Sequence, residues 1–176
     1  MVGDPERVQA GIVGRGGDGD ETVSEGCLCG SSLMLVSGPA PDQARSFFER
    51  YAAAFARYDA VALVELFAFP LHIVGIVDMP TAISIPSRDD WLPLLDGLLG
   101  SYRRLGVAGG VPLELQVSEL TGRACSVRLH WELRRDDGSA IYDFTAIYTL
   151  AQVDRAWRVF AIVHDELPKL NAALGR

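Results

Sequence analysis

Two long runs of strand-forming residues near the carboxyl end constrain the fold more than any other feature of this sequence. Residues 140–152 read AIYDFTAIYTLAQ and residues 156–166 read AWRVFAIVHDE, with a short polar turn between them. Thr, Tyr, Ile, Val, Phe and Trp crowd both runs, which is typical of strands in a pleated sheet. A hairpin of this length needs a second layer to cover it, and only amphipathic segments earlier in the chain can supply that layer.

Three earlier segments have the spacing of amphipathic helices, in which apolar residues recur every three or four positions. Asp59 can cap the second helix, and Ser87 can cap the third. Gly106 follows the third helix as a C-terminal stop. The helices are therefore expected over residues 41–58, 60–67 and 87–105.

Alternating or continuous apolar runs predict the strands. Pro80 and Pro86 bracket one of them, so that strand should be short and lie at an edge of the sheet. The order helix, helix, strand, helix and then four antiparallel strands predicts an α+β domain. The expected strands are residues 71–77, 81–85, 113–120, 123–134, 140–152 and 156–166.

The first part of the chain has a different composition from the rest. Residues 1–38 contain nine of the 18 glycines, with scattered acids and no sustained hydrophobic period, so we expect a disordered tail there. A G-x-G-x-x-G pattern at Gly14 is interpreted as incidental, because acidic residues follow it instead of a helix. The folded domain is expected over residues 39–170, followed by a C-terminal tail over residues 171–176. The sequence leaves open whether the natural start is Met1 or Met34.

Charge and composition exclude several classes of function. The formal net charge is −7 and the isoelectric point is about 4.9, which argues against nucleic-acid binding. No apolar run is long enough for a membrane span. Three cysteines without C-x-x-C spacing indicate a reducing, cytoplasmic setting. The single lysine, Lys169, lies near the C-terminus, and we expect neither a bound cofactor nor a metal.

The segment FFERYAAAFARYDAVALVELFA at residues 47–68, followed by the late hairpin ending in WRVFAIVHDE, resembles the nuclear transport factor 2-like superfamily. That superfamily includes ketosteroid isomerases and SnoaL-like polyketide cyclases, and the similarity covers residues 42–168. The resemblance implies a cone, in which a bent antiparallel sheet wraps around three N-terminal helices and leaves one pocket at the open end. It also implies a homodimer, since such domains commonly pair through the outer face of the sheet.

The catalytic residues of ketosteroid isomerases are carried over only in part. Those enzymes have a tyrosine in the first helix, an aspartate base after the second helix and another acid on a late strand. Tyr51 matches the tyrosine, but the base position falls on Gly75 and the late acid falls near Ile147. Steroid-isomerase chemistry is therefore not expected.

Strand pairing can be derived from the turns. With the hairpin tip at residues 154–155 and no bulge, Leu150 lies opposite Val159 and Thr145 lies opposite His164. With the preceding loop at residues 136–139, His130 lies opposite Thr145. One face then carries a mixture of polar and apolar side chains, namely Arg128, His130, Glu132, Asp143, Thr145, Ile147, Phe160, Ile162 and His164. The other face is apolar apart from its tyrosine hydroxyls and carries Val127, Leu129, Trp131, Leu133, Tyr142, Phe144, Tyr148, Leu150, Val159 and Val163.

Two interpretations of these faces stay open. In the first, the apolar face packs on the helices and the mixed face is a solvated exterior. In the second, the mixed face is the pocket wall, and the apolar face with Trp131 and Tyr148 is buried in the homodimer. A single bulge would reverse the assignment of later residues.

The second interpretation defines a candidate site. His164 would be a general base whose tautomer is fixed by Asp143, and Tyr51 would donate to a developing oxyanion. The alternative is that these polar groups only satisfy one another. The candidate substrate-binding residues are His130, Arg128, Thr145, Phe160, Ile162 and His72.

The expected function is that of a SnoaL-like protein with a hydrophobic pocket for a small apolar molecule. Proton-transfer chemistry without a cofactor would make it an isomerase, a cyclase or a dehydratase. The alternative is a non-catalytic module that binds a ligand or dimerises. The sequence leaves open whether catalysis occurs and which molecule binds.

Overall fold

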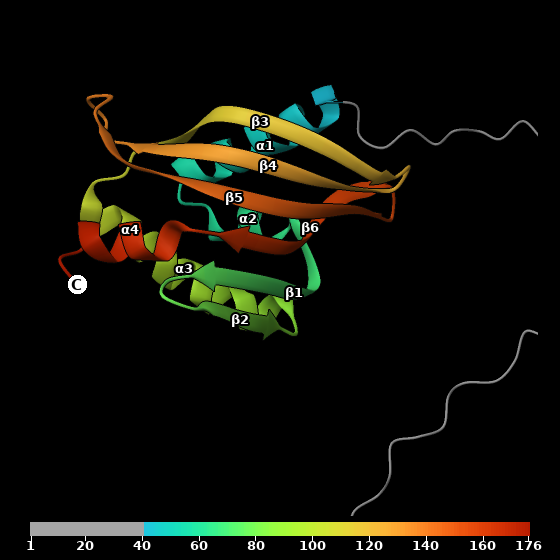
Figure 1. Ribbon diagram of the computed structural model, residues 1–176, viewed down its shortest axis with the longest axis horizontal. Helices are drawn as coiled ribbons and strands as arrows, with labels where there is room; N and C mark the ends of the chain where they lie inside the picture. The colour runs from blue at the N-terminus through green and yellow to red at the C-terminus, as the bar shows by residue number, and fades with distance from the viewer. Residues whose placement is uncertain (1–40) are drawn as a thin grey trace, which may run out of the picture. The chain divides into compact units, whose positions relative to one another are not determined.

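The computed structural model describes residues 41–176 (Figure 1). The expectations for residues 1–38, including the glycine pattern and Cys27 and Cys29, lie outside the described residues. The helices are α1 (Pro41–Ala56), α2 (Ala60–Val64), α3 (Arg88–Leu105) and α4 (Glu166–Ala173). The strands are β1 (Phe67–Ile76), β2 (Pro80–Ile85), β3 (Gly109–Thr121), β4 (Ala124–Arg134), β5 (Ala140–Val153) and β6 (Ala156–His164).

The six strands form one curved sheet in the order β2-β1-β6-β5-β4-β3. The α+β class is thereby confirmed, but the sheet is not wholly antiparallel, because β1 and β6 run parallel. The chain explains this exception. After the β1–β2 hairpin it crosses through α3 to the far edge, and β3 to β6 then return as a meander. β6, the fourth strand of that meander, therefore lies beside β1 and runs in the same direction as β1.

The helix ends follow the predicted capping residues. The Asp59 carboxylate accepts a hydrogen bond from the Ala62 amide at 2.9 Å, and the Ser87 hydroxyl accepts one from the Asp90 amide at 3.3 Å. Gly106 ends α3 in the left-handed conformation with φ of 71°, which costs glycine little. The second helix is shorter than predicted, because it ends at Val64 and β1 already begins at Phe67.

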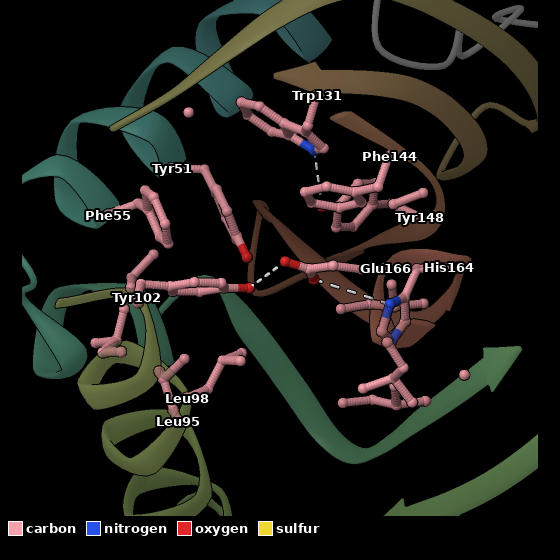
Figure 2. A pocket seen from close by; sticks show the side chains of 18 of the residues that line it. Tyr51, Phe55, Leu95, Leu98, Tyr102, Trp131, Phe144, Tyr148, His164 and Glu166 are labelled. Carbon is pink, nitrogen blue, oxygen red and sulfur yellow. Dashed lines mark hydrogen bonds and ion pairs between the residues drawn. The ribbon is translucent and has the colours of Figure 1, made fainter. Parts of the chain in front are cut away.

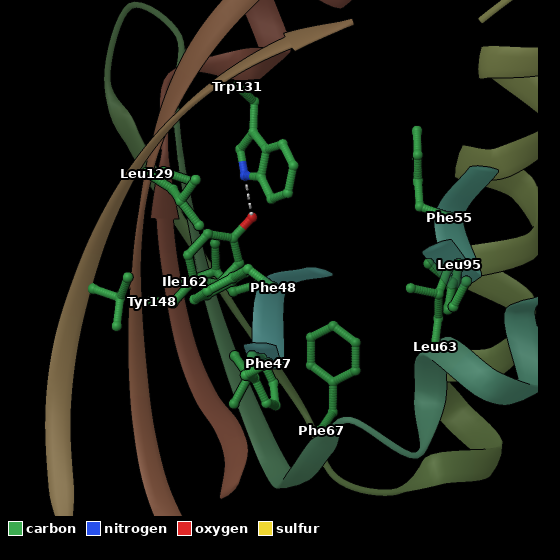
Figure 3. Close-up of a cluster of buried hydrophobic side chains, with 14 of the residues drawn as sticks. Phe47, Phe48, Phe55, Leu63, Phe67, Leu95, Leu129, Trp131, Tyr148 and Ile162 are labelled. Carbon is green, nitrogen blue, oxygen red and sulfur yellow. Dashed lines mark hydrogen bonds between the residues drawn. The ribbon is translucent and has the colours of Figure 1, made fainter. Parts of the chain in front are cut away.

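The core lies between the helices and the inner face of the sheet. Phe48 of α1 packs against Tyr148, with ring centroids 4.8 Å apart, and the indole Nε1 of Trp131 donates to the Tyr148 hydroxyl at 3.0 Å (Figure 3). Both sheet residues are 3% exposed within this single chain. The first interpretation of the apolar face is therefore correct, and the predicted dimer interface through Trp131 and Tyr148 is wrong.

A β-bulge in β6 changes the face on which the end of that strand lies. Leu150 pairs with Val159 as predicted, but Thr149 then pairs with Ala161, so Phe160 is an extra residue. His164 consequently pairs with Ala146 and not with Thr145. Because side chains alternate along a strand, this one-residue shift moves His164 onto the inner face.

The last helix, α4, has no counterpart in the prediction and includes residues 171–173 of the expected tail. Glu166 and Leu170, one turn apart, are both buried, so this face of α4 packs on the end of the sheet. Among residues 41–176, no helix has the length and hydrophobicity needed to cross a membrane.

Candidate functional site

A cavity of about 250 Å³ lies between the inner face of the sheet and α1–α3, and α4 contributes to one end of it (Figure 2). Its walls are built from opposite layers of the fold, so the cavity exists only after the layers have packed. Aliphatic side chains of α3 and of β1 and β2 also line it. The aromatic walls are Tyr51, Phe55, Trp91, Tyr102, Trp131, Phe144 and Tyr148.

Glu166 is a buried acid in this largely apolar cavity. Glu166 is 6% exposed, and its carboxyl oxygen Oε1 accepts hydrogen bonds from the hydroxyls of Tyr102 at 2.5 Å and Tyr142 at 2.9 Å. Burial raises the pKa of the carboxyl group from 4.5 to about 6, and the two tyrosine hydrogen bonds only partly oppose that shift. The carboxyl group is therefore poised to gain or lose a proton near neutral pH.

His164 lies beside Glu166, as Figure 2 shows. Its Nδ1 is 3.9 Å from Glu166 Oε2, which is too long for a hydrogen bond, and Nδ1 has no hydrogen-bond partner among the described residues. Burial lowers the pKa of the imidazole, and the nearby Asp165 carboxylate opposes this only in part. The ring is thus a neutral base at neutral pH, with a free nitrogen next to a carboxyl oxygen.

Tyr51 completes the polar end of the cavity. Figure 2 shows its hydroxyl pointing toward the space that the Tyr102 hydroxyl and the Glu166 carboxyl also occupy. Burial and the charge of Glu166 raise the pKa of Tyr51, so its hydroxyl stays protonated and can donate a hydrogen bond. A base, an acid that titrates near neutrality and a fixed donor therefore meet at one end of an apolar space.

Three of the residues selected from the sequence line this cavity. They are Tyr51 from α1, and Ile162 and His164 from β6. The two β6 residues reach it because of the bulge at Phe160, which itself does not line the cavity.

The other selected residues lie elsewhere. His130 pairs with Thr145 across β4 and β5, as predicted, but on the outer face of the sheet. There His130 Nε2 bonds Asp143 Oδ2 at 2.6 Å, a contact that lowers the pKa of the Asp143 carboxyl. Asp143 therefore cannot orient His164, because the sheet separates them. Arg128 lies 3.7 Å from Glu114 on the same outer face, and His72 is exposed on β1.

Sequence reasoning missed Glu166, which is central to the site. A signal was present, because Glu166 and Leu170 are one helical turn apart and Leu174 continues that face. An acid on the apolar face of a terminal helix is an unusual position and indicates a buried carboxyl group. No comparable local signal marked Tyr102 or Tyr142, whose hydroxyls meet Glu166 only in the folded chain.

Gly75 has a role that differs from the one considered from the sequence. It pairs with His164 on the neighbouring strand and lines the cavity. A Cβ at this position would lie 2.4 Å from Leu167 Cδ1. The glycine therefore leaves room for the first turn of α4 to close over this end of the site.

Within residues 41–176, no group of three His, Cys, Asp or Glu side chains is arranged to hold a metal ion.

A curved sheet packed on N-terminal helices around an aromatic cavity is the architecture of NTF2-like proteins with a cystatin-like fold. Residues 42–167 match the family described as NTF2-like protein (DUF6841), and this chain belongs to that family. No curated protein matches the sequence.

Solved structures with the same fold are only distantly similar in sequence. An NTF2-like protein of unknown function from Shewanella oneidensis is 14% identical, with a TM-score of 0.57 over 70% of this chain and 97% of that chain. An NTF2-like protein from Novosphingobium aromaticivorans is 19% identical, with a TM-score of 0.57 over 76% and 86%. A proposed scytalone dehydratase from the same organism is 14% identical, with a TM-score of 0.50 over 69% and 79%. These similarities establish the fold.

Proposed function

We propose that the protein catalyses proton transfer on a neutral, largely apolar metabolite, as an isomerase, a cyclase or a dehydratase does. The observation that carries this proposal is the pairing of His164 with Glu166 at the end of an aromatic cavity, with 3.9 Å between Nδ1 and Oε2. Burial moves the pKa of the acid upward and that of the imidazole downward. Both groups are thereby suited to exchange protons with a substrate near neutral pH.

The roles follow from the protonation states. Neutral His164 accepts a proton from a carbon next to a carbonyl group, so a C–H bond breaks and an N–H bond forms. The electron pair moves to the carbonyl oxygen, which a protonated Tyr51 or a protonated Glu166 can stabilise by donating a hydrogen bond. The electron pair then returns from the oxygen while the His164 imidazolium gives up its proton. A proton delivered to a different carbon completes an isomerisation, and one delivered to a β-hydroxyl group, which leaves as water when its C–O bond breaks, completes a dehydration.

The surroundings support such a role. The Tyr102 and Tyr142 hydroxyls hold Oε1 of Glu166 and leave Oε2 facing His164. Tyr102 and Tyr142 are therefore positioning residues for the acid. One of the two Novosphingobium aromaticivorans structures with this fold is named a proposed scytalone dehydratase, a name compatible with dehydration chemistry on this scaffold.

Hydrogen–deuterium exchange tests the proposal without knowledge of the natural substrate. Small enolisable aromatic ketones, α-tetralone among them, are incubated with the protein in D₂O, and loss of the α-proton signal is followed by NMR. The wild-type protein should accelerate exchange, and His164→Ala should reduce that acceleration by roughly a hundredfold. Glu166→Gln, which keeps the tyrosine contacts but cannot titrate, should also reduce it.

His130→Ala provides the matched control, because this histidine lies on the outer face and bonds Asp143. Exchange in this variant should equal that of the wild type. If His164→Ala and His130→Ala exchange the ketones equally fast, the acid–base assignment is wrong.

A second candidate function is a carrier that binds its ligand without changing it. Two tyrosine hydroxyls already hold Glu166 Oε1. A carboxyl group that only bound a ligand would need the same positioning. A carrier would bind the ketones, with no exchange above the rate in buffer.

A further inference from the structure

Asp165 lies between the two residues of the acid–base pair, and its side chain takes part in the sheet. The Thr145 amide donates a hydrogen bond to Asp165 Oδ1 at 2.8 Å, and the Asp165 amide donates one to the Thr145 carbonyl at 3.3 Å. In a regular antiparallel ladder, two residues paired in this way exchange main-chain hydrogen bonds only. The carboxylate oxygen of Asp165 therefore takes the place of its own main-chain carbonyl.

This replacement explains how a strand can end and a helix begin almost at the same residue. β6 ends at His164 and α4 begins at Glu166. Asp165 between them has φ of −105° and ψ of 19°, so the chain leaves the extended conformation there and the carbonyl is rotated out of its ladder position. Because Oδ1 accepts from the Thr145 amide, that amide keeps a partner despite the turn.

Asp165 does not have the usual role of an aspartate before a helix. It occupies the N-cap position of α4, where aspartate commonly accepts a hydrogen bond from an amide of the first turn, but its side chain makes no such bond. Its Oδ2 instead lies 3.2 Å from Nζ of Lys169, the single lysine of the chain. Capping of α4 therefore does not account for this residue.

The turn at Asp165 determines how the acid and the base face each other. His164 is paired with Ala146 of β5, and Glu166 belongs to the first turn of α4. Only Asp165 separates them in the chain, and 3.9 Å separates His164 Nδ1 from Glu166 Oε2. A change in the backbone at residue 165 would therefore rotate one side chain relative to the other.

We propose that Asp165 is a positioning residue, which holds His164 and Glu166 in register by fixing the turn between β6 and α4 to Thr145. The inference rests on the proposed function for the role of the pair. Asp165 itself does not line the cavity, so it acts through its two neighbours and not on a bound molecule.

The charge of Asp165 adds an effect that can be measured. Burial lowers the pKa of His164 and raises that of Glu166, and the Asp165 carboxylate raises the pKa of both groups. Lys169 on α4 opposes this at Glu166. The remaining titratable groups around Glu166 are the hydroxyls of Tyr51 on α1, Tyr102 on α3 and Tyr142 on β5.

NMR of the wild-type protein tests the contact directly. A long-range HNCO experiment detects the scalar coupling across a hydrogen bond, between the amide nitrogen of the donor and the carbon of the acceptor group. The Thr145 amide nitrogen should couple to the side-chain carboxyl carbon of Asp165. Coupling to the main-chain carbonyl carbon of Asp165, or no coupling to Asp165 at all, would overturn the proposal.

Two variants separate the contact from the charge. Asp165→Asn keeps an acceptor oxygen for the Thr145 amide and removes the charge, whereas Asp165→Ala removes both. The pKa of His164, measured by NMR titration of its imidazole, should fall in the asparagine variant because the neighbouring carboxylate is gone. In the alanine variant the released ring should gain contact with water, and its pKa should rise toward the ordinary value of 6.5.

Exchange of the α-protons of α-tetralone provides the second measurement, at a pH where His164 is neutral in every variant. Displacement of a catalytic group by about 1 Å can cost roughly a hundredfold in rate, so Asp165→Ala should exchange the ketone at least about tenfold more slowly than the wild type. Asp165→Asn should stay within about threefold of the wild type, because the position of the pair is kept.

Asp137→Ala is the matched control. Asp137 Oδ1 accepts a hydrogen bond from the Ser139 amide at 2.8 Å in an exposed turn, so this variant loses the same kind of contact and one negative charge. Both the His164 titration and the ketone exchange should be unchanged. The coupling in the wild type and the titration of Asp165→Asn decide the matter even if Asp165→Ala does not fold.

The two proposals fail in different ways. If exchange depends on His164 but Asp165→Ala exchanges the ketone as fast as the wild type, the positioning role is wrong and the acid–base site stands. If the coupling and the opposite pKa changes are found but the wild type does not accelerate exchange, Asp165 still positions the pair and the proposed catalysis is wrong.

Discussion

At the scale of single residues, Glu166 shows how burial changes the chemistry of an ordinary carboxyl group. Its two tyrosine hydrogen bonds stabilise the ionised form, and desolvation outweighs them, so its pKa is about 6. The folded protein therefore holds a proton that the unfolded chain releases between pH 4.5 and about 6. This proton links folding to pH at the candidate site.

The first prediction concerns that linkage. A carboxyl group whose pKa is raised by folding stabilises the fold at low pH and loses this contribution as pH rises through the folded pKa. With a shift from 4.5 to about 6, the loss is about 2 kcal/mol. The difference in unfolding free energy between wild type and Glu166→Gln should change by this amount from about pH 3.5 to about pH 7, measured by urea denaturation.

Glu49→Gln on α1 is the control, since Glu49 is exposed and its replacement also removes one charge. His164 acts in the opposite direction, because a lowered histidine pKa costs stability as pH falls. Comparing variants with wild type at each pH removes this contribution. A difference between wild type and Glu166→Gln that is constant with pH would contradict the prediction.

The second prediction concerns Gly75. In Gly75→Ala the new methyl group would collide with Leu167 Cδ1, so the leucine must turn away from its place in the cavity. We expect a loss of about 1–2 kcal/mol in unfolding free energy, typical of overpacking. In a Leu167→Ala background the same substitution should cost much less, which a double-mutant cycle by urea denaturation can measure. Equal costs in both backgrounds would mean that the contact with Leu167 is not the cause.

At the scale of secondary-structure elements, α3 and β6 decide which groups reach the cavity. α3 carries Trp91 near its beginning and Tyr102 near its end, so the ends of this helix set the positions of both. β6 carries His164, and the extra residue at Phe160 directs it inward. Substitutions at the ends of α3 or at the bulge in β6 should therefore affect the site more than substitutions on exposed faces.

The third prediction tests the cap of α3. Ser87→Ala removes the acceptor for the Asp90 amide and should lower the unfolding free energy by about 1 kcal/mol. Ser87→Asp should retain most of the stability, because aspartate caps helices as well as serine does. Chemical denaturation of the three proteins checks this, and an alanine variant as stable as wild type would show that the cap contributes nothing.

At the scale of the whole molecule, the apolar face of the sheet is the wall of the chain's own core. Trp131 and Tyr148 pack on α1 and line the cavity, so they hold the two layers together. A homodimer stays a prediction, and it would have to use another surface.

The fourth prediction follows from this arrangement. Trp131→Ala should lower the unfolding free energy by about 3–5 kcal/mol, as expected for a large aromatic side chain removed from a core. Thermal denaturation at two protein concentrations tenfold apart should show the same dependence of the Tm on concentration for the wild type and for the variant, because Trp131 does not lie between subunits. Ile147→Ala on the outer face, where the side chain is 40% exposed, should cost less than about 1 kcal/mol. A wild-type Tm that rises with concentration, together with a Tm of Trp131→Ala that does not, would restore the interface hypothesis.

Local sequence was sufficient for most of the secondary structure. Apolar periodicity located α1 and α3, and Asp59, Ser87 and Gly106 marked the helix ends, because caps depend on residues close in the chain. The expected loop at residues 136–139 determined the register of β4 and β5, including the pairing of His130 with Thr145. Of the candidates that the sequence indicates for the site, Tyr51, Ile162 and His164 line the cavity.

The arrangement of the site depended on tertiary structure. Nothing in the local sequence around Phe160 distinguishes a regular strand from a bulged one, since both neighbouring strands must be in place before the extra residue has a cost or a benefit. Because of that one extra residue, the acid beside His164 is Glu166 and not Asp143. Glu166 in turn meets Tyr102, which lies 64 positions earlier in the sequence, so its pKa is a property of the packed layers. Periodicity acts over a few residues and is read from the chain, whereas burial and long-range pairing arise only when distant segments come together.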